Sequence, residues 1–140
     1  MDIKKLLIGG IVGGILYFGL GYLIYGNLLM GFMQKNAGVV SVDRAQADLQ
    51  FLYIAIGSVL QGFLIAYIFV RANVSSVGSG FVTAGVVGLL SSAGMDSIMY
   101  GTTLSMSKTM MAADVAAATV MTAVIGAILA LVMNMGKKAA

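Results

Sequence analysis

Two carboxylic acids stand where an ion site inside a membrane could form. Asp96 lies within a long apolar stretch, and Asp114 lies near the start of the next one. Burying an ionisable residue within an apolar span is destabilising, so such a residue indicates a functional site. The spacing therefore predicts a cation or proton site built from Asp96 and Asp114. Two other interpretations stay open: an ion pair with Lys108 in the connection, and a position at the wet membrane interface.

Gln61 is a third polar residue within an apolar stretch. Amide side chains inside membrane spans commonly form hydrogen bonds between helices. We expect this role for Gln61, and also for Asn134 near the end of the last span. The alternative for Gln61 is a place along a solute path.

The composition excludes several kinds of chemistry. The chain has no cysteine and no histidine, which removes disulfides, the usual zinc sites and histidine-ligated haem. No nucleophile–base pair can be assembled, so we expect no enzyme, no bound cofactor and no metal. The eight Lys and Arg residues are scattered, so we expect no nucleic-acid partner.

The elements that position these residues are four apolar spans in one integral membrane domain, residues 1–140. Hydrophobic residues make up 60% of the chain and charged residues only 9%, against roughly 25% charged residues in soluble proteins. Spans of this length cross a bilayer only as helices. Asp48, just before the second span, suits a helix N-cap. The spans run from about Leu6 to Met30, Leu49 to Val70, Gly78 to Gly101 and Ala112 to Met135.

The basic residues predict the orientation of this all-α, antiparallel four-helix bundle. If the N-terminus is cytoplasmic, five basic residues lie on the cytoplasmic side and three on the other, which favours both termini inside. The five are Lys4, Lys5, Arg71, Lys137 and Lys138, and the three are Lys35, Arg44 and Lys108.

Small residues recur every fourth position in the spans. Residues four apart share one helix face, and small side chains there allow close approach of another helix. In the third and fourth spans we expect these faces to pack within one chain. The glycines of the first span could pack there or against a second copy. The residues predicted to pack against a neighbouring helix are Gly10, Gly14, Gly80, Gly88 and Gly126.

The first span and its loop, GGIVGGILYFGLGYLIYGNLLMGFMQKNAG (Gly9–Gly38), resemble a known sequence pattern. The shared features are a glycine-rich first helix, Tyr25–Gly26, the Gly31-Phe32-Met33 run, Gly38 and an acidic residue, Asp114, opening the last helix. The segment is similar to the start of a bacterial family of small four-helix membrane proteins, domain of unknown function one-seven-six-one. The resemblance implies four spans in a bacterial cytoplasmic (inner) membrane and brings no activity.

Two functions follow as hypotheses. The first is a structural or assembly role, as a self-associating bundle (a homo-oligomer) or a small subunit of a larger membrane complex, with the lipid bilayer as the other partner. The small-residue faces and the near absence of soluble mass favour it. The alternative is a small cation, proton or solute channel or transporter that uses Asp96 and Asp114.

Overall fold

The computed structural model describes residues 1–40 and 42–135, and these form an all-helical protein. Four helical segments are long and apolar enough to cross a membrane: α1 with its continuation η1, then α3, α4 and α5. In chain order the elements are α1 (Ile3–Leu23), the π-helix η1 (Ile24–Leu28), α2 (Met30–Lys35), the 3-10 helix η2 (Gln46–Asp48), α3 (Phe51–Arg71), α4 (Val77–Thr102) and α5 (Lys108–Asn134).

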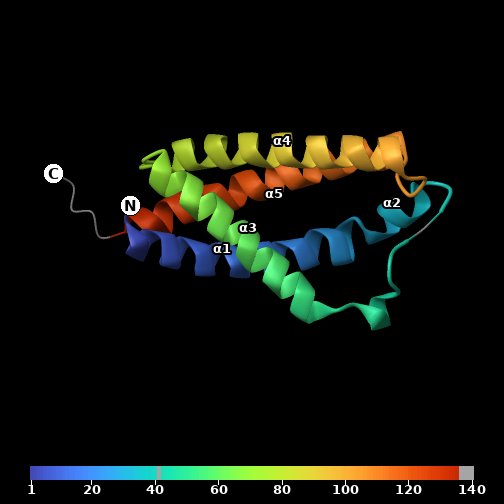
Figure 1. Ribbon diagram of the computed structural model, residues 1–140, viewed down its shortest axis with the longest axis horizontal. Coiled ribbons are helices and arrows are strands. Elements are labelled where there is room, and N and C mark those ends of the chain that lie inside the picture. The colour runs from blue at the N-terminus through green and yellow to red at the C-terminus, as the bar shows by residue number, and fades with distance from the viewer. Residues whose placement is uncertain (41, 136–140) are drawn as a thin grey trace.

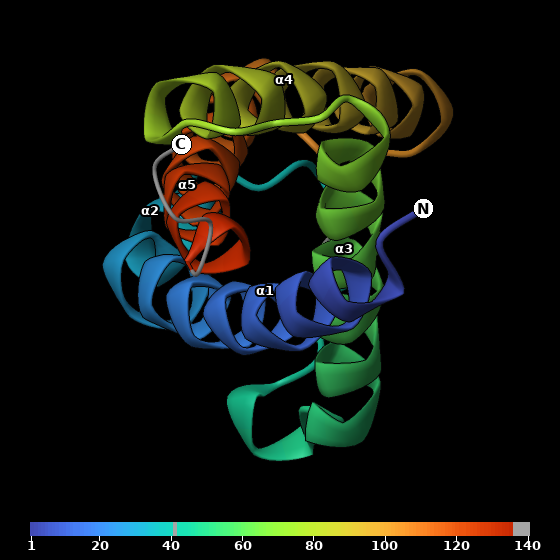
Figure 2. The same cartoon turned by 90° about the vertical axis from the view of Figure 1, so that its left-hand side faces the viewer.

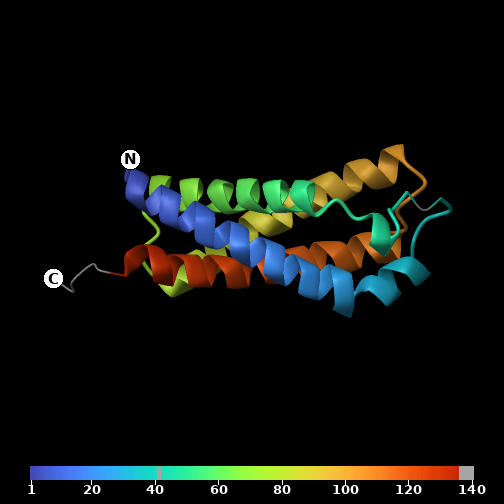
Figure 3. The same ribbon diagram turned by 90° about the horizontal axis from the view of Figure 1, so that it is seen from below.

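The long helices pack as two pairs. α1 packs closely against α3, α4 packs closely against α5, and α1 also contacts α5 (Figures 2 and 3). Met1, the turn between α3 and α4, and the end of α5 lie at one end of the molecule, here called the N-terminal end (Figure 1). The connections before α3 and between α4 and α5 approach the opposite end, here called the loop end.

Glycine and alanine form the seam between α4 and α5. A Cβ atom added to Gly80 would lie 2.5 Å from the Ala130 Cβ, and one added to Gly88 would lie 2.7 Å from the Thr122 Cβ. A Cβ on Gly126 would meet the side chain of Ala84. Contacts this close hold the two backbones together and leave no room for larger residues.

Glycine also forms the seam between α1 and α3. A Cβ on Gly10 would lie 2.5 Å from the Phe63 ring, and one on Gly14 would lie 2.9 Å from the Val59 Cα. The glycine face of the first helix is therefore occupied within the chain.

The buried interior is small and apolar, and α5 supplies much of it. The largest fully buried side chains are Phe69, Ile65, Ile125 and Leu129. By contrast, Leu52, Leu90 and Leu131 are each more than half exposed. Exposed apolar side chains on every long helix suit a hydrocarbon surrounding rather than water.

Local caps fix where the helices begin. The Ser76 hydroxyl accepts a hydrogen bond from the Ser79 N–H at 3.1 Å and completes a capping box at the start of α4. The Ser107 hydroxyl accepts from the Met110 N–H at 3.1 Å and caps α5. The expectation that Asp48 caps the second span was wrong. Asp48 lies in η2, and Gln50 precedes α3 without a side-chain cap.

Two connections are joined at the loop end. The Gly38 N–H donates to the Ser105 carbonyl at 3.0 Å, and the Val40 N–H donates to the Leu104 carbonyl at 3.3 Å. The Ser107 hydroxyl donates to the Asn36 carbonyl. A Cβ at Gly38 would collide with the Leu104 backbone, so this contact requires glycine. The connection that follows α2 is thereby attached to the one that precedes α5.

Candidate functional site

The seam between α4 and α5 brings the two predicted acidic residues together. Asp96 lies roughly 9 Å before the end of α4, and Asp114 lies roughly 9 Å after the start of α5, at 1.5 Å per residue. The two carboxyls are near neighbours at this shared depth. The close α4–α5 contact at Gly88 lies about two turns before Asp96 along the same helix.

Asp96 is buried and incompletely paired. Its side chain is only 5% exposed, whereas Asp114 is half-buried. The Oδ2 atom of Asp96 is buried and has no hydrogen-bond partner within residues 1–40 and 42–135. An ionised carboxylate in such a position is strongly destabilising, so its charge must be neutralised or compensated.

Lys108 does not supply that compensation. It is exposed at the first turn of α5, and its ammonium group does not reach the Asp96 Oδ2 atom. The ion pair considered from the sequence is therefore absent at this oxygen among the described residues.

Tyr25 is the third member of the cluster, and sequence reasoning missed it. Its phenol lies beside Asp114 and near Asp96. Tyr25 belongs to η1, where the Leu29 N–H donates to the Ile24 carbonyl at 2.7 Å and closes a π-helical turn. Such turns occur often at functional sites. Nothing in the apolar pattern signals a π-turn, and the resemblance alone marked Tyr25–Gly26.

Tyr25 also lines an aromatic groove. It has a volume of about 880 Å³ and lies between the α1–η1–α2 segment and the chain from Asp43 to Ser58, with Met110 of α5 also lining it. Its aromatic residues are Tyr17, Phe18, Tyr22, Tyr25 and Phe51, and its charged residues are Asp43 and Arg44.

Gln61 does not join the carboxyl cluster. It is exposed near the middle of α3, and its amide makes no hydrogen bond within the described part of the chain. The neighbouring residues Gly62, Ile65 and Ala66 are the buried ones. The cross-helix bond expected for Gln61 is not present among residues 1–40 and 42–135.

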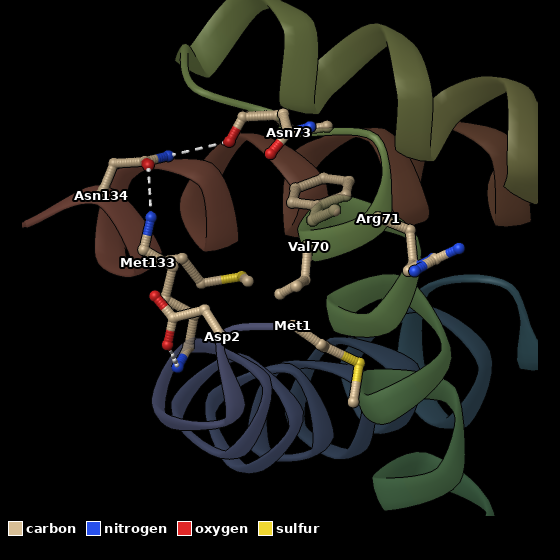
Figure 4. Close-up of a pocket in the computed structure, with 10 residues that line it drawn as sticks. Met1, Asp2, Val70, Arg71, Asn73, Met133 and Asn134 are labelled. Carbon is tan, nitrogen blue, oxygen red and sulfur yellow. Dashed lines mark hydrogen bonds between the residues drawn. The ribbon is translucent and has the colours of Figure 1, made fainter.

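Asn134 does form bonds between helices, at the N-terminal end. Its amide donates to the Val74 carbonyl at 3.2 Å and to the Ala130 carbonyl at 2.8 Å. Its oxygen accepts from the Lys5 ammonium at 3.3 Å. Figure 4 shows this cluster at a pocket of about 470 Å³. Asn134 therefore links α5 both to α1 and to the turn that follows α3.

One further polar contact lies between these two ends. The buried Tyr17 hydroxyl donates to the Thr122 hydroxyl at 3.4 Å.

Within the described residues, no group of three or more His, Cys, Asp or Glu side chains is arranged to hold a metal ion. No protein-family model, curated protein or solved structure matches this chain.

Proposed function

We propose that the chain is an antiparallel four-helix bundle in a bacterial cytoplasmic membrane, with both termini in the cytoplasm. Among the described residues, Lys4, Lys5 and Arg71 are balanced by Lys35, Arg44 and Lys108. Lys137 and Lys138 lie outside the described residues and tip the balance toward a cytoplasmic C-terminus. Because the chain lacks cysteine, single cysteines at Ser75 and Thr103 would report the orientation. An impermeant maleimide added to intact cells should label only the Thr103 variant.

We propose that the Asp96–Asp114 pair reversibly binds a proton or a small cation, and that the protein moves this ion across the membrane. The observation that carries the proposal is the buried Asp96 Oδ2 atom, which has no partner among the described residues. Two neighbouring carboxyls without a cationic side chain between them are costly when both are ionised. A proton or cation shared by the pair removes that cost.

The carboxyl pair lies nearer to the loop end than to the N-terminal end. Both carboxyls lie roughly 9 Å inside the loop end. The Tyr25 phenol beside Asp114 can donate a hydrogen bond to an ionised carboxylate and relinquish it when a cation arrives. The two carboxyls are the ion-binding residues of the proposal, and Tyr25 is a positioning residue.

Flux into liposomes tests this function. Reconstituted protein should carry protons, Na⁺ or K⁺ down an imposed gradient. Asp96→Asn should lower the rate by about tenfold or more, because a neutral amide cannot balance the charge of a bound cation. Asp48→Asn is the matched control, since Asp48 is exposed in η2. Flux by neither protein, or equal flux by wild type and Asp96→Asn, would refute the proposal.

A second function, self-association, is favoured by one specific observation: the Gln61 amide is exposed in mid-span and makes no hydrogen bond to the residues that the structure describes. A polar group facing hydrocarbon is unfavourable, and an amide carries both a donor and an acceptor. Two copies related by a two-fold axis can therefore satisfy each other through Gln61. Gly57, one turn earlier, has open space beside it and would allow close approach.

Cross-linking tests this interface. With no native cysteine, Gly57→Cys and Leu64→Cys variants should form disulfide-linked dimers in native membranes. Tyr17→Cys, on the buried face of α1, is the matched control and should not. Gln61→Leu should reduce cross-linking at Gly57→Cys by about sevenfold, since one such hydrogen bond contributes roughly 0.6 kcal/mol and a symmetric pair makes two. Uncross-linked Gly57→Cys protein would exclude the interface.

A further inference from the structure

One side chain, Tyr25, borders both the aromatic groove and the carboxyl pair. Tyr25 lines the groove and at the same time lies beside Asp114. A ligand in the groove therefore comes close to the carboxyl pair without displacing a helix. The volume of about 880 Å³ falls in the range of small-molecule sites.

The chemistry of the walls selects a class of ligand. Five aromatic residues line the groove, and methionines at 30, 33 and 110 add soft, adaptable surface. Aromatic faces attract organic cations, most strongly where water is excluded. Apolar walls alone would accept any lipid-soluble compound. The charge near the groove therefore decides whether cationic, neutral or anionic compounds bind.

Two carboxyls near Tyr25 place negative charge close to the groove. Asp43 and Arg44, which both line the groove, carry opposite charges. Behind Tyr25, Asp114 and Asp96 carry two carboxyls with no basic residue pairing the buried Asp96 oxygen among the described residues. An apolar site with excess negative charge attracts cations and disfavours anions.

We propose that the groove binds a lipophilic organic cation, which competes with the small ion for the Asp96–Asp114 pair. The exchange between the organic cation and the small ion rests on the proposed function. The choice of ligand rests on the residues of the groove. Binding places the positive charge against the Tyr25 face, while the apolar body contacts Phe18, Tyr22 and Phe51. When the organic cation enters, the proton or small cation leaves the carboxyl pair.

Binding of tetraphenylphosphonium to the purified full chain in a neutral detergent tests the ligand class. Equilibrium dialysis against empty micelles should show saturable binding, and the neutral analogue triphenylphosphine oxide should show none. Tyr22→Leu and Phe51→Leu should each weaken the affinity by about fivefold, because each removes one aromatic face. Tyr67→Leu is the matched control, since Tyr67 is an exposed aromatic residue that does not line the groove.

The exchange step is tested separately. Asp114→Asn should weaken binding of the probe, and lowering the pH should weaken it in wild type, because protons compete for the carboxyl pair. No saturable binding above empty micelles, or binding unaffected by Tyr22→Leu and Phe51→Leu, overturns the inference. So does displacement of the probe by a phospholipid in a manner that depends on Arg44, because the groove would then be a lipid site.

These failures are distinguishable from failure of the proposed function. Proton or alkali-ion flux that depends on Asp96, without tetraphenylphosphonium binding, leaves the ion site standing and removes the organic cation. Binding of tetraphenylphosphonium that depends on the groove but not on Asp114, without small-ion flux, removes both the exchange step and the ion site.

Discussion

At the N-terminal end of the bundle, the half-buried Asn134 amide donates to Val74 and accepts from Lys5, so two other segments of the chain bond it. At the loop end, Asp96 is more deeply buried, yet one of its oxygens has no partner among the described residues. The first arrangement connects helices and stabilises them. The second costs stability, and buried polar groups left unpaired in this way often mark a site where something binds.

The two ends differ also in the backbone that surrounds them. At the N-terminal end, the turn after α3 is tight, and Asn73 adopts a positive φ of 53° that asparagine tolerates. At the loop end, α1 continues into a π-helical turn. A tight turn therefore lies beside the bonded cluster, and a π-helical turn lies beside the incompletely bonded one. The following predictions test whether the two clusters differ in what they contribute to stability.

The largest expected effect comes from separating α4 from α5, which would pull the two carboxyls apart. A valine at Gly126 would collide with the Ala84 side chain. Gly126→Val should lower the free energy of unfolding in mixed micelles by about 3 kcal/mol, because neither backbone can withdraw without breaking the seam. Gly94→Val, which meets open space on α4, is the control and should change it little. Equal losses for both variants would show that the seam is not what holds these helices.

Asn134→Ala should have the next largest effect. It removes the bonds to Lys5 and Val74 and leaves the part-buried Val74 carbonyl without that donor, so we expect a loss of about 1–2 kcal/mol in the free energy of unfolding. Asn27→Ala is the control, because the Asn27 amide bonds only the nearby Tyr22 carbonyl on the exposed side of the chain. If Asn134→Ala is no worse than Asn27→Ala, the N-terminal cluster does not join the helices.

Asp96→Asn should act in the opposite direction. Replacing a buried, incompletely paired carboxyl by a neutral amide should raise the free energy of unfolding by about 1 kcal/mol at pH 7. The same variant should lose ion flux, so stability and activity would move oppositely. Thermal or chaotrope unfolding with Asp48→Asn as control measures the first effect. A clear loss of stability instead would identify Asp96 as a structural residue, like Asn134.

The sequence was sufficient for the four helices, because apolar length and the need to satisfy the backbone admit few alternatives. It also predicted that Asp96 and Asp114 belong to one site, because one lies inside an apolar span and the other near the start of the next. It failed for Gln61, because α3 is apolar on all sides and its pattern does not identify the buried face. The position of Tyr25 depends on the π-helical turn, for which neither proline nor a change in hydropathy gives a signal.

The smallest expected effect concerns the contact midway between the two ends. The Tyr17 hydroxyl donates to Thr122 at 3.4 Å, a long bond between buried side chains of α1 and α5. Tyr17→Phe should lower the free energy of unfolding by about 0.6 kcal/mol or less, the average for hydrogen bonds between membrane helices. Thr122→Val and the double variant complete a cycle, and non-additivity would measure the bond itself.

A coupling as large as the whole loss caused by Asn134→Ala would mean that polar bonding is spread along the bundle. In that case hydrogen bonding would not distinguish the N-terminal end from the loop end. The Asp96 Oδ2 atom, which has no partner among the described residues, would then need an explanation other than ion binding.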